Sequence, residues 1–448
     1  MSLDTQIFRI FAHYMTLSAR QTYLRFIAAL MLAVLCFAAT AQERETITGS
    51  PNQAATHDSI IVSIITCGPG RELYSRFGHT AIRVRNLTLN QDIVFNYGCF
   101  NYNEDNFIFK FLTGQTDYML EAEHFQRFIK RYEHMGNCVE DQMLNLTYTE
   151  KAKILSILSE NLKPENQRYR YNWLYDNCTE RARDVVEQAI EGKLYYRLDN
   201  IGDYTARELI EQNLEGSEWT LFGINMILGQ EIDKILNYRL FMFIPEWYYL
   251  NLAFAVIADS NGEIRRMAAP PTILLHENLP EAEKTPWYLT PENIFLCLAI
   301  ILGIIAFMEF VTGKHLWPID ITVHTVQGLV GVLVSFLFFF SSHPGASTNW
   351  LVLIFNPLAL FYAAWIYHCH RKKKKNKAAF FAVILTLASI ITITFCPQKI
   401  DDAMSFVFII LTLRTSVQFN FALNGEYTTY LYRKLSVCIK RRKARHHS

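Results

Sequence analysis

The chain has 448 residues, of which 51% are hydrophobic and only 19% are charged, whereas soluble globular proteins carry about 25% charged residues. This shortfall predicts that part of the chain lies in lipid, and the length accommodates two domains. The formal net charge of +1 provides no overall attraction to nucleic acid, and the nine cysteines show no metal-ligand spacing. We therefore expect no nucleic-acid partner, no metal and no cofactor.

Residues 1–41 have the pattern of an export signal. Arg20 and Arg25 precede a short apolar run over residues 26–38, and residues 39–41 then supply a small-x-small cleavage site. The alternative is an uncleaved membrane anchor, but the apolar run is shorter than the ~20 residues that a span requires. In both cases the segment that follows is exported.

Residues 58–291 have the mixed composition of a folded exported domain. Runs rich in β-branched residues predict strands over residues 59–65, 80–85, 93–97 and 137–146. Helical periodicity predicts helices over residues 122–133, 149–161, 179–190 and 205–215. Together these elements predict an α+β domain built on a small antiparallel sheet.

Five apolar runs follow this domain, and each approaches the ~20 residues needed to cross a bilayer. They cover residues 293–311, 323–341, 350–367, 378–395 and 403–423. Basic residues lie at 371–375, between the third and fourth runs, and at 440–445, after the fifth. Because basic loops remain in the cytoplasm, we expect an all-α domain of about five transmembrane helices over residues 292–425, a basic cytoplasmic tail over residues 426–448, and the exported domain on the opposite side.

Two further features have alternative interpretations. Arg414 lies inside the fifth apolar run, where a cation is costly and usually has a partner or a task, unless its long side chain reaches a headgroup phosphate. The aromatic-rich stretch over residues 219–254 either lies against lipid headgroups or forms ordinary helical core. For this stretch we favour core.

Cys178 is the first candidate for chemistry. Asp176 or Asn177 is expected to cap a helix that begins near Cys178, and Glu180 follows Asn177 at the capping-box distance. The amide N–H groups and the dipole at a helix start lower the pKa of a thiol and stabilise a developing oxyanion. The alternative is a small buried cysteine with no chemical role.

His79 is the candidate base for this thiol. It follows Gly78 and opens the second predicted strand, from which a side chain can reach a helix tip. A third group usually holds such a base in place, and Asn96 and Asp92 lie on or just before the next predicted strand. Asn96 comes near His79 only if the register of the two strands allows it.

The exported domain contains three other cysteines, Cys67, Cys99 and Cys138. An oxidising compartment allows two of them to form a disulfide, which would leave Cys178 free as a nucleophile must be. A pairing that consumes Cys178 remains open at this stage.

Several short pieces occur together in an order that resembles one protein family. In the exported domain they are Ser75-Arg76-Phe77-Gly78-His79-Thr80-Ala81, Asn96-Tyr97-Gly98 with Phe100, Gly114 with Tyr118, and Asp176-Asn177-Cys178-Thr179 with Arg181. In the membrane part they are Ser342-His343-Pro344, Asn349-Trp350 and Asn356-Pro357-Leu358. The set resembles the Lnb-type bacterial lipoprotein N-acyltransferases over most of the chain, although Cys99 and Cys138 depart from the expected pattern.

This resemblance implies a circularly permuted papain-like fold of the NlpC/P60 type, in which the histidine precedes the cysteine. Lecithin:retinol acyltransferase belongs to the same broad group. The resemblance implies His79 and Cys178 as the catalytic pair, to which we add Asn96 as the expected third group. Asn177, Tyr97 and His343 are expected to contact the substrate.

The implied reaction is a thiol acyl transfer at the membrane face. An acyl chain would move from a membrane phospholipid, through a Cys178 thioester, to the α-amine of a diacylglyceryl-cysteine lipoprotein. The implied location is the bacterial inner membrane, with the catalytic domain in the periplasm. Two alternative functions remain. One is a periplasmic NlpC/P60-like cysteine amidase or peptidase that acts on the cell wall, and such an enzyme would not require five transmembrane spans. The other is a non-enzymatic membrane scaffold, which would not require a reactive Cys178.

Overall fold

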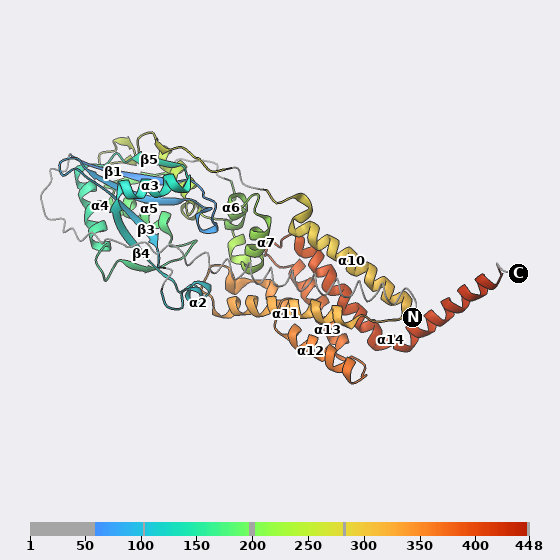
Figure 1. Cartoon of the computed structure of the whole chain (residues 1–448). Helices are drawn as coiled ribbons and strands as arrows, with labels where there is room; N and C mark the ends of the chain where they lie inside the picture. Colours follow the sequence, from blue (N-terminus) through green and yellow to red (C-terminus); the bar gives the residue numbers. More distant parts are fainter. Residues whose placement is uncertain (1–58, 102–103, 197–201, 281–283, 446–448) are drawn as a thin grey trace. The chain divides into compact units, whose positions relative to one another are not determined.

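A computed structural model describes residues 59–101, 104–196, 202–280 and 284–445. The predicted export signal, residues 1–41, lies outside the described residues. An α+β sheet domain comes first along the chain and a helical domain follows it (Figure 1), which confirms the predicted fold class.

The exported domain is built on a seven-stranded sheet with the strand order β10-β5-β1-β2-β3-β4-β6. Its central strands are β1 (Ile60–Cys67), β2 (His79–Asn86) and β3 (Gln91–Cys99), which lie at three of the predicted positions and pair antiparallel. Ile64 and Ile82 are fully buried there, because β-branched side chains pack well on a pleated surface. The buried centre of the sheet therefore holds β2, the strand that begins at His79, in place.

The outer strands are less visible in the sequence. β5 (Val139–Met143) falls inside the predicted strand 137–146. The structure adds elements that were not predicted, namely α2 (Phe107–Leu112), β4 (Asp117–His124), β6 (Arg168–Arg170), β10 (Thr272–Leu275) and a second, three-stranded sheet of β7 (Lys193–Tyr195), β8 (Val256–Ala258) and β9 (Ile264–Arg266). The predicted helix over residues 122–133 began too early, because residues 122–124 pair with β3 as the end of β4 and this pairing overrides their helix propensity.

The helices of this domain agree with the prediction to within a few residues. They are α3 (Phe125–Met135), α4 (Tyr148–Asn161), α5 (Cys178–Ala189) and α6 (Ala206–Asn213). α5 packs against β2 and β3, and its inward residues Ala182, Val185 and Val186 are buried. The helix that begins at Cys178 therefore rests on the strand that begins at His79.

The aromatic stretch over residues 219–254 forms short helices. These are α7 (Glu218–Ile227), α8 (Tyr238–Phe241) and α9 (Pro245–Phe254). Phe222, Phe241, Phe243 and Tyr248 are buried, so the stretch is mainly helical core, as favoured above. Trp219 keeps 45% of its surface exposed.

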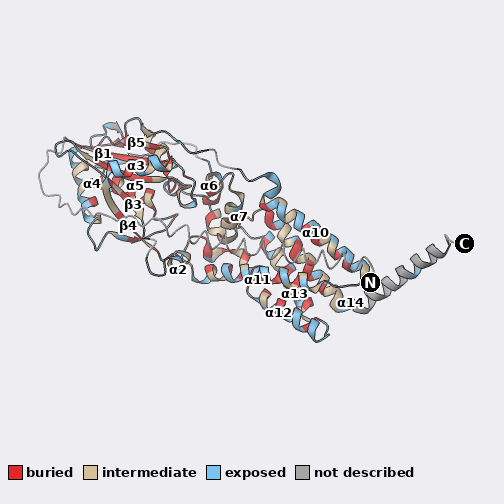
Figure 2. Ribbon diagram, in the orientation of Figure 1, coloured by how far each residue is buried: buried red, intermediate tan, exposed pale blue. Residues whose placement is uncertain are grey.

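The membrane part contains four segments that are long and apolar enough to cross a bilayer. They are α10 (Pro291–Thr312), α11 (Trp317–Phe340), Trp350–Arg371, and residues Ala403–Leu423 of α14 (Ala403–Arg445). Figure 2 shows extensive exposed surface along α10 and along α12 (Leu358–Arg371). The fourth predicted span, α13 (Ala378–Thr394), has 17 residues, which rise about 25 Å against a hydrocarbon core of about 30 Å.

Two details of the membrane part differ from a simple five-helix pattern. The third predicted span is divided into a single 3₁₀ turn, Trp350–Leu353, and α12 (Leu358–Arg371). Pro357 lacks an N–H group and interrupts the helix, and Asn356 Oδ1 accepts a hydrogen bond from the Leu358 amide at 3.2 Å. In addition, α14 continues as one helix into the predicted cytoplasmic tail.

Arg414 does not reach a headgroup. Its side chain is 0% exposed, and it lies between two buried carboxylates from α10 and α11. Its Nη1 is 2.6 Å from Glu309 Oε2, and its Nε is 2.6 Å from Asp320 Oδ1. The intramembrane cation is thus paired, and it joins three helices.

Candidate active site around Cys178

The register of the sheet brings Asn96 to His79. β2 and β3 pair with Ile82 opposite Phe95, and the same register continued by one residue places Asn96 beside Ala81, two residues from His79. Such a diagonal neighbour lies about 7–8 Å away, within reach of longer side chains. Nε2 of His79 accordingly hydrogen-bonds to Oδ1 of Asn96.

This contact also orients the imidazole ring. Asn96 is buried, and because a carbonyl oxygen can only accept, Nε2 of His79 is the donor. Nδ1 then remains for Cys178. Asp92, the other candidate for a third group, lies towards the opposite end of β3 and forms a 2.6 Å ion pair with Arg83.

Cys178 is the first residue of α5, and Asn177 is its N-cap. The Asn177 side-chain oxygen accepts hydrogen bonds from the amides of Thr179 at 2.9 Å and Glu180 at 3.0 Å, which confirms the expected cap. The expected capping box does not form, because the Glu180 carboxylate turns to Arg183 at 3.3 Å. Cys178 therefore lies at the N-terminus of a helix that is capped by the Asn177 side chain.

Gly98 lies against both Cys178 and His79. Its φ is +85°, and a Cβ there would lie 3.4 Å from the Cys178 Cβ and 4.0 Å from the His79 Cε1. The His79 ring and the Cys178 thiol lie close enough for each to shift the pKa of the other, and the Thr179 hydroxyl lies 4.0 Å from the Cys178 sulfur. The two residues singled out in the sequence are thus brought together beside Gly98.

The electrostatics of this pair favour a thiolate and an imidazolium. Burial raises the pKa of Cys178, but the charge of His79, its hydrogen bond and the Thr80 N–H together bring the pKa below its ordinary value. Burial lowers the pKa of His79, but the Cys178 charge and the hydrogen bonds to Cys178 and Asn96 bring it above its ordinary value. A nucleophilic sulfur beside a proton donor is the arrangement that acyl transfer requires.

The helix start leaves one amide for an oxyanion. Asn177 occupies the amides of Thr179 and Glu180, and the Arg181 amide donates to the Asn177 carbonyl at 3.0 Å. Among the described residues, the N–H of Cys178 is the first-turn amide that keeps no protein acceptor. From the sequence we expect several such groups, and the cap reduces them to this one.

Two threonines that join the strand to the helix were not predicted from the sequence. The hydroxyls of Thr80 and Thr179 lie 3.1 Å apart and are buried. Each threonine directly follows a candidate residue, His79 or Cys178, and this shared position was the available signal. Their contact holds the start of β2 against the start of α5.

Two tyrosines near the thiol were also missed. Burial, followed by the nearby Cys178, raises the pKa of both Tyr169 and Tyr171 well above the ordinary value. Tyr169 carries the Arg181 guanidinium 4.0 Å from its ring centre. Both tyrosines thus lie near enough to Cys178 for its charge to act on their hydroxyls.

The predicted substrate-contacting residues lie in three different settings. Tyr97 is 1% exposed, and its hydroxyl accepts a hydrogen bond from Asn161 at 2.8 Å. His343 lies in the loop after α11, where its Nε2 donates to the Phe111 carbonyl at 2.6 Å. Asn177 uses its side chain entirely for protein contacts, so only its backbone remains for a substrate.

Cys67, Cys138 and Cys178 are free thiols, so no disulfide consumes the candidate nucleophile. The Cys99 thiol lies 3.5 Å from the Asn96 carbonyl. Within the part of the chain that the structure describes, no group of three or more His, Cys, Asp or Glu side chains is arranged to hold a metal ion.

Replacing Asn177 by alanine should test the helix cap. The Asn177 Nδ2 also donates to the carbonyls of Trp173 and Phe243, at 2.9 and 2.8 Å, so the change leaves several buried groups unsatisfied. We expect a loss of about 2 kcal/mol of stability, measured as a lower midpoint of thermal unfolding. Asn166→Ala, which removes an exposed amide, is the matched control, and an equal loss in both variants would contradict the role of the cap.

Two family models match this chain. The model described as the Lnb N-terminal periplasmic domain matches residues 50–212, and that described as the Lnb transmembrane domain matches residues 282–425. No curated protein and no solved structure matches significantly. The first matched range contains His79, Asn96 and Cys178, and the second contains the candidate spans.

Proposed function

Since this chain is an Lnb-type protein, with a periplasmic domain joined to a transmembrane domain, we propose that it is a lipoprotein N-acyltransferase of the bacterial inner membrane. The observation that carries the proposal is the contact of Cys178 with His79 and of His79 with Asn96, at the start of a capped helix. The donor is a membrane phospholipid, and the acceptor is the α-amine of a diacylglyceryl-cysteine lipoprotein.

The first half-reaction forms a thioester. The Cys178 thiolate attacks an ester carbonyl of the phospholipid, and the N–H of Cys178 donates to the oxyanion that develops. When the carbon–oxygen bond breaks, the His79 imidazolium gives its proton to the departing oxygen of the lysophospholipid. Asn96 keeps the ring in place through Nε2 during this transfer.

The second half-reaction consumes the thioester. The α-amine of the lipoprotein attacks the thioester carbonyl, and neutral His79 takes the proton that the amine loses. The carbon–sulfur bond then breaks, an amide forms, and the Cys178 thiolate is restored. Neither step needs a cofactor, because the overall exchange of an ester for an amide is favourable and the thioester is only an intermediate.

The membrane domain supports this choice of substrates. Both the donor and the acceptor carry acyl chains in the bilayer, and a domain joined to apolar helices meets them at a high effective concentration. Within this proposal Asn177 and Tyr97 position the site, because their side-chain polar groups are occupied. His343 is proposed to act at the membrane side of the domain.

The proposal is tested by the product. The wild-type chain is expressed in cells from which the endogenous lipoprotein N-acylation has been removed, and the N-terminal peptides of lipoproteins are analysed by mass spectrometry. We expect a mass gain of one acyl chain on the α-amine. Unmodified α-amines, with the protein present in the membrane, would overturn the proposal.

The same cells distinguish the two alternatives. A cell-wall amidase or peptidase would change the peptide fragments released from the wall and would leave lipoprotein amines free. A non-enzymatic scaffold would change neither. Analysis of wall fragments beside lipoprotein peptides therefore separates all three functions in one experiment.

A further inference from the structure

The helix α2 (Phe107–Leu112) presents an unusually apolar surface for a domain outside the membrane. Five of the six residues in Phe-Ile-Phe-Lys-Phe-Leu are apolar, and none is buried. Ile108, Phe109 and Phe111 expose 61%, 57% and 48% of their surface. Neighbouring exposed apolar residues of this kind mark a site of interaction rather than an ordinary wet surface.

α2 is held to the end of a membrane span. The amide and the hydroxyl of Ser342, which follows α11, both donate to the Thr113 carbonyl at 3.0 Å. The Phe109 ring lies 5.9 Å from that of Phe336 on α11. Gly114 makes this approach possible, because a Cβ there would lie 2.6 Å from the Ser342 hydroxyl oxygen.

This end of α11 is the periplasmic end. α10 begins directly after the periplasmic domain, so α11 returns across the membrane and ends outside, near Phe340. Phe339 and Phe340 there are 69% and 65% exposed, and Trp287 before α10 is 75% exposed. Exposed aromatic side chains at the ends of spans lie at the interface between lipid and water. The exposed side of α2 thus continues a lipid-facing surface, and the fitting occupant is the bilayer.

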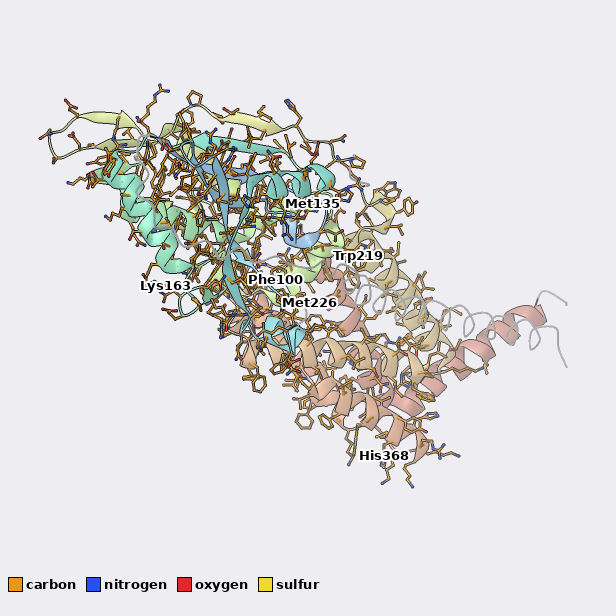
Figure 3. The ribbon with its side chains drawn as sticks, turned by 60° about the vertical axis from the view of Figure 1, so that its left-hand side comes forward. Phe100, Met135, Lys163, Trp219, Met226 and His368 are labelled. Carbon is orange, nitrogen blue, oxygen red and sulfur yellow. The ribbon has the colours of Figure 1, made fainter. Side chains whose placement is uncertain are left out.

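From α2 a row of aromatic rings leads into the domain. Phe111 lies 6.2 Å from Phe107, and Phe107 lies 5.6 Å from Phe100, measured between ring centres. Phe100 lies 4.8 Å from Tyr118, which stacks on Tyr171 at 4.0 Å. Figure 3 labels Phe100 at the end of the sheet where α2 also lies. We call these five residues the aromatic row.

The aromatic row ends beside the thiol. Phe100 is two residues beyond Gly98, at most about 7 Å along the chain, and Gly98 lies against Cys178. Tyr171, at the far end of the row, is close enough to Cys178 for the sulfur to influence its pKa. Stacked rings offer an apolar wall that places no hydrogen-bonding demand on a hydrocarbon chain.

We propose that α2 inserts into the outer leaflet of the inner membrane, and that the aromatic row guides the acyl chain of the donor phospholipid from the bilayer to Cys178. The insertion of α2 is supported by its contacts with the end of α11 and by its exposed apolar side chains. The guiding of the acyl chain rests on the proposed function.

Insertion is tested by cross-linking that requires no enzyme activity. The photoreactive residue p-benzoylphenylalanine replaces either Phe109 or Leu87 in the full chain, which is placed in vesicles of phosphatidylethanolamine and phosphatidylglycerol. Leu87 is the matched control, because it is 62% exposed but follows the opposite end of β2 from His79. We expect phospholipid adducts by intact mass at position 109 and none at 87. No adduct at 109, or equal adducts at both positions, would overturn the proposal.

Guidance of the acyl chain is tested by a charge on the inserted helix. We expect Phe109→Glu to slow acylation of Cys178 by bilayer phospholipid at least about tenfold, with alkylation of Cys178 by iodoacetamide unchanged. Leu87→Glu should leave both rates unchanged, and a water-soluble short-chain phospholipid should acylate Phe109→Glu as fast as wild type. If the soluble donor is slowed equally, α2 serves the domain's structure rather than lipid entry. If wild type is acylated by neither donor, the proposed function fails, while the cross-linking result still decides insertion.

Discussion

Replacing Cys178 by alanine is expected to abolish both the acyl-enzyme and the N-acylated product, whereas replacing His79 by glutamine should slow acylation by about 10²–10⁴-fold in a folded protein. Cys178 supplies the only atom that we propose to carry the acyl chain, so no partial activity should remain. His79 supplies a proton and a charge, both of which water replaces poorly. The measurement is the mass of the Cys178 peptide after incubation with phospholipid vesicles, with and without hydroxylamine, which cleaves thioesters.

The pH dependence of thiol alkylation tests the interaction of Cys178 with His79 without a substrate. The pKa of Cys178 lies below its ordinary value of 9.0, and the pKa of His79 lies above its ordinary value of 6.5. As the pH falls from 9, wild type should therefore keep its thiolate, and its rate of alkylation by iodoacetamide should decline at a midpoint below 9. In His79→Gln burial remains but the positive charge is lost, so the midpoint should move upward.

A control separates this effect from a general disturbance of the fold. Cys138 is a free thiol outside the pair, and burial raises its pKa above the ordinary value. Its alkylation profile should be the same in wild type and in His79→Gln. A Cys178 midpoint that is the same in both proteins, or an acylation rate unchanged in His79→Gln, would contradict the assignment of His79.

The centre of the site could be predicted because it depends on local sequence. The run of β-branched residues at 59–65 and the cap at Asn177 specify a strand and a helix start from neighbouring residues alone. The pairing of Asn96 with His79 could only be suggested, because a shift of one residue in the β2–β3 register would turn Asn96 to the other face of the sheet. The structure supplies that register.

Elements that depend on distant partners were not predictable. β10 pairs with β5, with Thr272 opposite Asp141, across a long stretch of sequence, and its four residues carry no distinctive pattern. α2 is apolar at five of its six positions and has no buried face, so its sequence does not show the pattern of an ordinary amphipathic helix. Its apolar character is explained only by the contact of Phe109 with Phe336 in a span more than 200 residues later.

The ion pairs of Arg414 could not be predicted for the same reason, because its partners Glu309 and Asp320 lie 105 and 94 residues away in sequence. Its environment leads to the second large prediction. Replacing Arg414 by methionine should destabilise the membrane domain by about 3–5 kcal/mol, because two buried carboxylates would lose their common cation. The expected observation is a clear fall in the thermal unfolding midpoint of the detergent-solubilised protein.

A variant in which all three charged side chains are made neutral separates the effect of charge on stability from the effect of packing. Asp320 also contacts His315 at 2.7 Å and Gln418, so polar partners remain for an uncharged side chain. The triple variant Arg414→Met with Glu309→Gln and Asp320→Asn should therefore recover most of the lost stability, since removing a whole buried ion cluster is often nearly neutral. A triple variant as unstable as Arg414→Met alone would mean that the volume and shape of the arginine, rather than its charge, hold the three helices together.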